Sequence, residues 1–326
     1  MSDYAVFAEK YRPKTLDSVV GQEHIMEFFK GFAKNKTIPH MMFAGPPGTG
    51  KTTIAKALAR EIFGDEWKSC FYETNASDAR KLSDIRQKIK EIARVSPINA
   101  DYKIIFMDEA DSLDHLAQPA LRRIIEDYSD ICRFILSCNY PSKIIEPIKD
   151  RLVEFRFRAL KPTEAAIMLR KIVEAEQIDI NKSSVHTLAT LTKGSMRKAL
   201  GLLSAFKMAN IDKIDDTKVY DSVYWVSDED IKKWIILMIQ GNLNSVDKQL
   251  DILLRDKSYT HYEIFESINR IVKESKSIPT EAKLRILQKL SETEYRLSMG
   301  ASEYIQLKGL MVYMMLVFKK YMRQEK

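Results

Sequence analysis

Eight consecutive residues offer a chemistry of phosphate binding. Residues 45–52 are Gly-Pro-Pro-Gly-Thr-Gly-Lys-Thr and match the pattern G-x-x-x-x-G-K-[ST] at every fixed position. Glycines let backbone N–H groups curl around an anion, the lysine reaches the β and γ phosphates, and the last hydroxyl can hold Mg²⁺. The candidate residues for binding a nucleoside triphosphate are therefore Gly45, Pro46, Pro47, Gly48, Thr49, Gly50, Lys51, Thr52 and Thr53.

A pair of carboxylates supplies a second element of this chemistry. Asp108 and Glu109 end the apolar run 103–108, which predicts a buried strand. Ligands bind an open α/β sheet at the carboxyl ends of its strands, where Asp108 can coordinate Mg²⁺ and Glu109 can polarise an attacking water. An acidic turn capping a strand is the alternative, and the presence of the glycine loop favours the catalytic interpretation.

The flanks of the loop match what the motif requires. His40–Ala44 is a short apolar run that predicts a strand, and residues 53–63 carry apolar side chains at helical spacing before Gly64. A strand, a glycine loop and a helix in this order place the loop at a helix N-terminus, which favours an anion. A chance glycine-rich turn would not have this context.

Alternating strands and helices predict an open parallel sheet with helices on both faces. After residue 159 the pattern becomes helical, so we expect an α/β domain over 1–159, a helical lid over 160–226 and a helical C-terminal domain over 227–326. Residues 212–228 are the expected linker between the two helical parts. The predicted strands are 40–44, 70–74, 103–108, 132–139 and 152–157, and the main predicted helices are 23–33, 53–63, 82–95, 116–127, 162–177, 183–192 and 195–209.

Composition limits the remaining possibilities. The chain has 326 residues, enough for two or three domains, and a net charge of +7, which permits a polyanionic partner without requiring one. Three cysteines, Cys70, Cys132 and Cys138, lack metal-ligand spacing and lie in apolar segments, so we expect buried reduced thiols in an intracellular protein. We expect no signal peptide, because no charged-then-apolar segment opens the chain. We expect no membrane-spanning segment either, since the longest apolar stretch, at 310–318, fits a buried helix.

The order of the motifs resembles a known family. The glycine loop followed by Asp108-Glu109-Ala110-Asp111 resembles the AAA+ ATPases, and further motifs resemble the small subunit of replication factor C, the sliding-clamp loader of archaea and eukaryotes. These motifs are Glu9–Pro13, Val20–Gln22, Asn75–Asp78, Gln118–Arg123, Asn139-Tyr140, Tyr295–Leu297, Gly300-Ala301 and Ile305–Leu307. The resemblance implies ATP and Mg²⁺ as cofactors and covers nearly the whole chain.

This resemblance assigns roles around the nucleotide. Asn139 matches sensor 1, which helps to place the water, and Arg197 matches sensor 2, which reaches from the lid to the nucleotide. The segment that packs against adenine corresponds to Tyr11, Arg12, Val19, Val20 and Gly21. Without the family, a turn asparagine, a solvated helix arginine and an ordinary N-terminal arm would be the simpler interpretations.

One implied residue acts on another subunit. Arg151 matches the arginine finger that completes a neighbour's ATP site, work for which a permanently charged guanidinium is suited. Its flanks depart from the family pattern Ser-Arg-Cys, because here they are Asp150 and Leu152. We expect that Asp150 can pair with Arg151 and restrain it when no neighbour is present.

The resemblance also implies macromolecular partners: a large subunit, further copies of this chain in a five-subunit ring, the sliding clamp, and primer–template DNA held through phosphates. Arg80, Arg86, Lys90 and Lys143 match the DNA-tracking positions, although a solvated charged face is the alternative. A weak candidate for clamp contact is the apolar cluster of Ile92, Val95, Pro97 and Ile98. The last helices carry apolar stripes, and we expect some of these residues to form a core and others to form a collar that joins subunits. Two rival functions stay open: another DNA-linked AAA+ enzyme, such as a branch-migration motor or an origin-recognition ATPase, and a scaffold subunit that binds nucleotide without hydrolysis.

Overall fold

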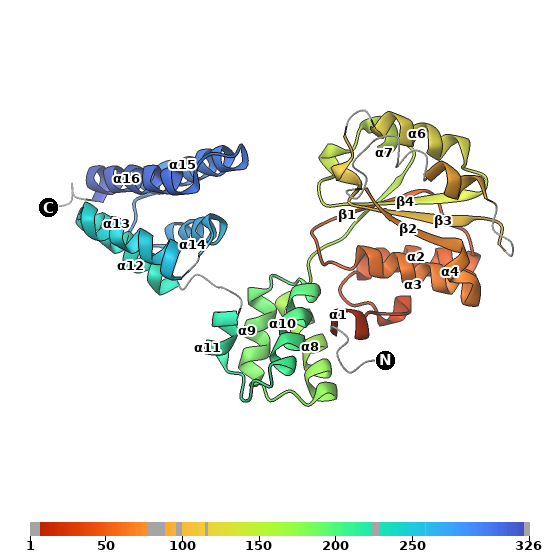
Figure 1. Ribbon diagram of the computed structural model, residues 1–326, viewed down its shortest axis with the longest axis horizontal. Helices are drawn as coiled ribbons and strands as arrows, with labels where there is room; N and C mark the ends of the chain where they lie inside the picture. Colours follow the sequence, from red (N-terminus) through yellow and green to blue (C-terminus); the bar gives the residue numbers. More distant parts are fainter. Residues whose placement is uncertain are drawn as a thin grey trace. The chain divides into compact units, whose positions relative to one another are not determined.

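The computed structural model describes residues 7–76, 89–95, 100–114, 117–222, 228–257 and 259–322. The chain forms two compact units, Met1–Val219 and Tyr220–Lys326 (Figure 1). The boundary between them lies near the one expected after residue 226. The boundary expected after residue 159 falls inside the first unit and stays a prediction.

The first unit contains a five-stranded, wholly parallel sheet in the order β2-β3-β4-β1-β5. Its strands are β1 (Met41–Ala44), β2 (Phe71–Asn75), β3 (Lys103–Asp108), β4 (Cys132–Cys138) and β5 (Val153–Arg156). All five predicted strands are confirmed, with ends that differ by at most one residue. The parallel sheet covered by helices that the sequence predicts is therefore present.

Alternate side chains of the central strands enter different cores because successive residues point to opposite faces. Met41 and Phe43 of β1 pack with α2 (Glu23–Asn35) and α3 (Lys51–Phe63), whereas Met42 and Ala44 pack with α6 (Ala117–Asp127) and α7 (Glu146–Lys149). Figure 1 shows these helix pairs on opposite faces of the sheet. Burial on both faces explains why β1, β3 and β4 are almost continuously apolar.

The register of the central strands brings three chain segments to one edge. Ala44 pairs with Cys138, and Met107 pairs with Leu136. The residues that follow β1, β3 and β4 therefore meet where the strands end, and they include Gly45, Asp108 and Asn139. Short elements connect the layers: η1 (Leu16–Ser18), η2 (Gly64–Glu66), α4 (Trp67–Cys70), η4 (Ala110–Ser112) and η5 (Pro141–Lys143).

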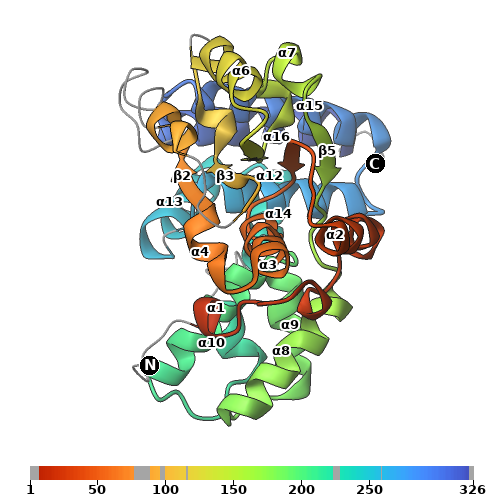
Figure 2. The same cartoon turned by 90° about the vertical axis from the view of Figure 1, so that its right-hand side faces the viewer.

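The lid helices complete the first unit. They are α8 (Pro162–Glu176), α9 (Lys182–Leu191) and α10 (Met196–Met208), followed by α11 (Asp216–Ser222). The N-terminal arm, residues 7–13, begins with α1 (Phe7–Lys10), and α1 packs against α10 (Figures 1 and 2). Phe7 is buried in that contact. The arm is thus attached to the lid through α1.

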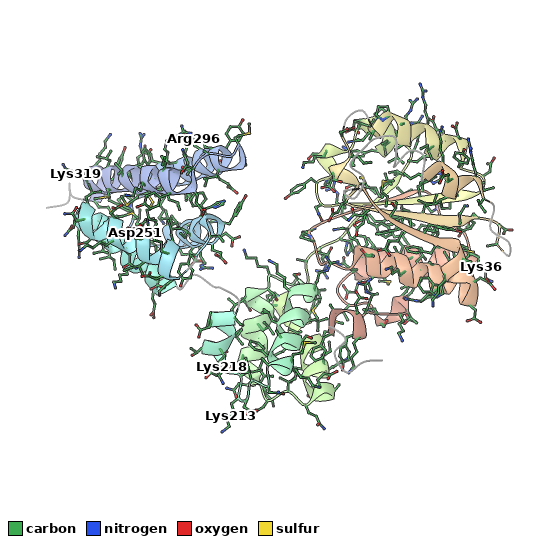
Figure 3. All side chains as sticks on the ribbon, viewed as in Figure 1. Lys36, Lys213, Lys218, Asp251, Arg296 and Lys319 are labelled. Carbon is green, nitrogen blue, oxygen red and sulfur yellow. The ribbon has the colours of Figure 1, made fainter. Side chains whose placement is uncertain are left out.

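The expected linker at 212–228 is partly wrong, because its first half is folded against the lid. Ile214 forms a parallel bridge with Ile180, and Val219 of α11 is fully buried. Lys218 donates to the carbonyl oxygens of Asp212 (2.6 Å) and Lys213 (3.2 Å), and Figure 3 shows both lysines on this turn. The bridge joins Ile214 to a residue that precedes α9, so this packing could not be predicted from the segment's own sequence.

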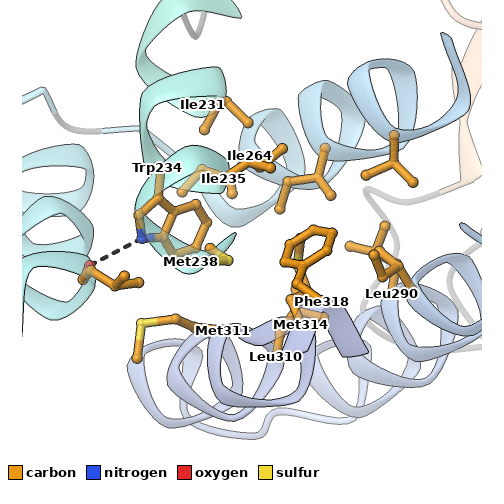
Figure 4. Close-up of a cluster of buried hydrophobic side chains, with 14 of the residues drawn as sticks. Ile231, Trp234, Ile235, Met238, Ile264, Leu290, Leu310, Met311, Met314 and Phe318 are labelled. Carbon is orange, nitrogen blue, oxygen red and sulfur yellow. Dashed lines mark hydrogen bonds between the residues drawn. The ribbon is translucent and has the colours of Figure 1, made fainter. Parts of the chain in front are cut away.

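The second unit is a helical bundle around its own core. Its helices are α12 (Asp228–Gln240), α13 (Leu243–Asp251) with the π-turn η6 (Ile252–Asp256), α14 (His261–Glu274), α15 (Thr280–Ser298) and α16 (Glu303–Met322). Trp234 is fully buried, and its indole N–H donates to the Val246 carbonyl at 3.0 Å (Figure 4). Of the helices in the described ranges, none joins the length to the apolar character that a bilayer crossing needs.

Candidate functional site

A cavity of about 420 Å³ lies at the carboxyl edge of the sheet, under the lid. It brings together the loop after β1, the end of β3, the residue after β4, the N-terminal arm and the start of α10. The predicted site residues that line it are Tyr11, Arg12, Val19, Val20, Pro47, Gly48, Thr49, Gly50, Lys51, Thr52, Thr53, Asp108, Glu109, Asn139 and Arg197. Gly21, Gly45 and Pro46 are not in its lining.

Glycine is required in the loop for two separate reasons. Gly50 has φ +97° and serves as the N-cap of α3, a conformation that side-chain-bearing residues rarely adopt. Gly48 has φ +78°, and a Cβ there would lie 2.4 Å from the Oγ of Ser195 on the lid. Position 48 of the loop therefore fits against the N-terminus of α10 only without a side chain.

Lys51 is buried at the centre of the loop. Its ammonium donates to the carbonyl oxygens of Gly45 (2.6 Å) and Pro46 (3.0 Å) and to Oδ1 of Asn139 (3.0 Å). Burial lowers the pKa of Lys51, and the nearby Asp108 carboxylate opposes that shift. The cation is thus held where the loop, β3 and β4 converge.

Two hard oxygen ligands face each other beside this lysine. The Thr52 hydroxyl donates to Oδ2 of Asp108 at 3.3 Å. A hydroxyl and a carboxylate in contact fit Mg²⁺, which takes one or two protein oxygens together with phosphate oxygens. The donor set present therefore suits the predicted metal site.

Glu109 lies at the exposed mouth of the cavity in an unusual backbone conformation. Its φ of +53° is left-handed, which costs about 1 kcal/mol for a non-glycine residue. Its own N–H donates to Oδ1 of Asp108 at 3.0 Å. The turn thus separates the two carboxylates, with Asp108 beside Thr52 and Glu109 at the cavity surface.

Asp111 fixes the position of Asn139, a role that sequence reasoning missed. Its carboxylate is nine-tenths buried and accepts the N–H groups of Asn139 (3.2 Å) and Tyr140 (3.1 Å). The residue stood inside the motif 108–111, but its partner 28 positions later could not be read from that motif. One carboxylate therefore ties the end of β3 to the end of β4.

The lid and the arm close the cavity from the other side. Arg197 stands in the first turn of α10, whose N-cap is Ser195. Tyr11 donates from its hydroxyl to Oε1 of Glu176 at 2.5 Å, and Arg12 pairs with Glu9. Glu9 and Pro13 also line the cavity and belong to the motif Glu9–Pro13, to which no site role was assigned. The lining residues that the sequence did not indicate are Ala8, Leu160, Met168, Met196 and Leu200. Met168, Met196 and Leu200 are apolar side chains at ordinary helix positions, and Leu160 just precedes α8, so none of them carries a signal in the sequence.

Arg151 does not line this cavity, as a residue acting on a neighbour would not. Its guanidinium pairs with Glu126 at the end of α6 and donates to the Pro147 carbonyl at 2.6 Å. The expectation that Asp150 restrains it is wrong, because the fold places the carboxylate of Glu126 there instead. A partner on another helix, well before Arg151 in the chain, was not visible from the flanking sequence.

Two of the four expected DNA contacts, Lys90 and Lys143, fall within the described residues, and the DNA role of all four stays a prediction. Arg80 and Arg86 lie outside the described residues, as do Pro97 and Ile98 of the expected clamp-contact cluster. Lys90 is half-buried in a helical segment, and Lys143 of η5 is exposed with its ammonium 5.1 Å from the Tyr140 ring centroid. Neither lysine lines the cavity.

All three cysteines are buried and unpaired with one another. Burial raises the pKa of Cys132 to about 11 and that of Cys138 to about 12. Both thiols are therefore protonated near neutrality and unsuited to nucleophilic work.

Two family models match the chain. Residues 41–160 match the ATPase family associated with various cellular activities (AAA), and residues 226–313 match the replication factor C C-terminal domain. The first match contains the loop, Asp108, Glu109, Asn139 and Arg151. The second falls in the helical second unit.

Similar curated proteins extend over the full chain. The replication factor C small subunit of Archaeoglobus fulgidus is 40% identical over 98% of this chain and 100% of its own length. The protein of the same name from Sulfurisphaera tokodaii is 38% identical over 99% of both chains. The one from Haloarcula marismortui is 40% identical over 94% of both.

Solved structures share the fold at greater distance. The RuvB Holliday junction branch migration motor of Thermotoga maritima is 20% identical, with a TM-score of 0.56 over 79% of this chain and 91% of its own. A point variant of the same motor gives a TM-score of 0.55 at 20% identity, over 74% of this chain and 87% of its own. At this identity the likeness concerns the fold alone.

Proposed function

This chain belongs to the replication factor C small subunits, within the AAA ATPases, and on that premise we propose that it hydrolyses ATP to drive the loading of a sliding clamp onto primer–template DNA. One observation carries the proposal: Lys51, Asp108, Glu109, Asn139 and Arg197 line a single cavity large enough for a nucleotide. A binding loop alone would be shared with any nucleotide-binding protein. The full set includes the groups that hydrolysis needs.

The residues divide the work by position. The loop's N–H groups and Lys51 hold the β and γ phosphates, and Lys51 gives up the Gly45 and Pro46 carbonyls to do so. When bound at Thr52 and Asp108, Mg²⁺ neutralises charge on the phosphate oxygens. Glu109 orients and deprotonates a water, and Asn139 holds that water in line with the γ-phosphorus.

Each site is completed by a neighbour in this proposal. Arg151 neutralises charge on the phosphates bound to an adjacent subunit, as an arginine finger does. To reach across, its guanidinium exchanges Glu126 for phosphate oxygens. Both are strong charge-assisted partners, so the exchange is feasible when the subunits dock.

The partners follow from family membership. We propose that this chain assembles with a large subunit and further copies of itself in a five-subunit ring, and that the ring binds the sliding clamp. Arg80, Arg86, Lys90 and Lys143 are proposed to track DNA phosphates, a contact that positions DNA without reading bases. Exposed apolar side chains on or beside α15 and α16, including Leu284, Met299 and Leu316, support a collar contact between subunits.

An ATPase assay tests the proposal. ATP hydrolysis by this chain with its large subunit is measured with neither addition, with clamp, with primed DNA, and with both. We expect the largest rate only with clamp and DNA together, and none without Mg²⁺. Stimulation by DNA alone, independent of clamp, would contradict clamp loading.

Two alternatives are separated by the same assay. The fold of a branch migration motor is similar, and such an enzyme would be stimulated by four-way junctions without a clamp. A scaffold subunit would bind ATP but show no hydrolysis that depends on Glu109. The presence of Lys51, Asp108, Glu109 and Asn139 in one cavity favours the hydrolytic subunit.

A further inference from the structure

A buried carboxylate joins the N-terminal arm to the lid on the far side of the cavity wall. Glu176 is the last residue of α8 and is only 7% exposed. Its oxygens accept the Tyr11 hydroxyl at 2.5 Å and the Lys10 ammonium at 2.6 Å, and they pair with Lys207 of α10. Lys207 also donates to the Glu176 carbonyl at 3.0 Å.

The charge of the Glu176 carboxylate is balanced by its partners. A carboxylate without partners would be costly at this depth, but two ammonium groups and a hydroxyl satisfy it. Burial by itself raises the pKa of Glu176, and the bonds from Lys10, Lys207 and Tyr11 outweigh it and hold the pKa at about 2. Burial, the hydrogen bond to Glu176 and its charge raise the pKa of Tyr11 to about 12. The carboxylate stays ionised, and the tyrosine stays a donor.

The same segments form the cavity wall. Tyr11 and Arg12 of the arm line the cavity, as do Met168 of α8 and Leu200 of α10, the helices that carry Glu176 and Lys207. Phe7 adds a second attachment, since it is buried against α10 and its ring stands edge-on to Tyr11 at 5.8 Å between centroids. Lid and arm are therefore one wall, joined behind the surface that a nucleotide would contact.

We propose that Glu176 is a positioning residue for the nucleotide base: by holding Tyr11, it fixes the arm against the lid and sets the wall on which the base packs. This inference rests on the proposed nucleotide binding in the cavity. In this arrangement the loop and Arg197 bind the triphosphate, and the base packs on the wall that Glu176 supports. Glu176 itself does not line the cavity.

The test compares two ligands that differ in the base. Dissociation constants for ATP and for inorganic tripolyphosphate, both with Mg²⁺, are measured by calorimetry on the full chain and on Glu176→Gln. A hydrogen bond to a charged group is worth about one to two factors of ten in affinity, so we expect ATP to bind about tenfold more weakly and tripolyphosphate to bind unchanged. A specific loss for the base-bearing ligand is not what a general loss of structure would produce.

Matched variants make the outcome decisive. Glu174→Gln changes an exposed glutamate two residues away and should alter neither constant. Tyr11→Phe removes only the hydroxyl and should weaken ATP selectively; adding Glu176→Gln to it should then change little, because the shared contact is already gone. This second variant keeps the test valid if Glu176→Gln folds poorly.

Two results would overturn the inference: unchanged ATP affinity in both Glu176→Gln and Tyr11→Phe, or equal weakening of both ligands. If the parent chain itself bound no ATP, the proposed function would fail instead. If the parent binds ATP and the variants match it, only the role of Glu176 is refuted.

Discussion

Asp111 offers the sharpest test of how the catalytic edge is built. Its carboxylate accepts the backbone N–H groups of Asn139 and Tyr140 at 3.2 and 3.1 Å. Hydrogen bonds to a charged group contribute about 1.5 to 3 kcal/mol each, and these long ones belong at the lower end, so Asp111→Ala should cost about 3 kcal/mol of unfolding free energy. Urea unfolding followed by circular dichroism measures that loss.

The functional consequence should be confined to the chemical step. Without Asp111, the loop bearing Asn139 loses its anchor, and a misplacement near 1 Å at a reacting group costs about a hundredfold in rate. We expect kcat of the assembled ATPase to fall between about tenfold and a hundredfold, with ATP affinity unchanged because the loop and Lys51 are intact.

A neighbouring aspartate provides the control. Asp114 accepts the N–H of Ala117 at 2.6 Å at the start of α6, away from Asn139. Asp114→Ala should cost about 1 kcal/mol as a lost helix cap and leave kcat unchanged. The same substitution is also made in an Asn139→Ala background, where it should lower kcat little, because the residue that Asp111 positions is already gone. If Asp111→Ala lowered kcat there by the same factor as in the parent, the two residues would act independently and the positioning argument would be refuted.

Further predictions concern the base, the finger and the stability of both units. Glu109→Gln should bind ATP normally and hydrolyse it at least about a hundredfold more slowly, and a variant as fast as the parent would remove Glu109 from the base role. Arg151→Ala should lower kcat by about a thousandfold in the assembled ring while sparing ATP binding, and full activity there would exclude a finger in trans. Burial, with the nearby Arg133, lowers the pKa of His40 to about 4, and its ring nitrogen accepts the Phe134 N–H at 3.1 Å. The unfolded chain therefore binds more protons between about pH 4 and 6.5, so stability should fall as the pH drops through that window, by at most about 1.4 kcal/mol per pH unit, and His40→Asn should reduce that slope. Trp234→Ala should destabilise the second unit by about 3 to 5 kcal/mol in denaturant unfolding, and a cost below about 1 kcal/mol would contradict its role as the core's centre.

Much of the α/β part could be predicted because its signals are local. The glycine pattern at 45–52, the apolar run before it and the acidic end of β3 each depend on a few adjacent residues. The strands β1, β3 and β4 are covered on both faces and stand out as apolar runs. The strands β2 and β5 also carry polar residues and were recognisable from the alternation of strands with helices. Asp108, Asn139 and the loop then had to meet, since the carboxyl ends of neighbouring parallel strands share one edge.

The lid and the restraints on key side chains could not be predicted in the same way. The partner of Arg151 proved to be Glu126 rather than the adjacent Asp150. The helix α11 lies within 212–228, a segment whose place between two helical patterns predicted a linker. In both cases the structural role depends on contacts with residues that are distant in the sequence, so the local sequence does not predict it.

The sequence by itself predicted the chemistry of the site: the residues proposed to bind phosphate, the carboxylates proposed to serve the metal and the water, and the strand ends that carry them. Backbone conformation and side-chain period are set within a few residues, so short patterns suffice. Only the tertiary structure decided how the cavity is closed, since the Tyr11–Glu176 contact spans 165 positions and the Lys51–Asn139 contact spans 88. Such contacts depend on how whole helices pack, and no short stretch of sequence contains that information.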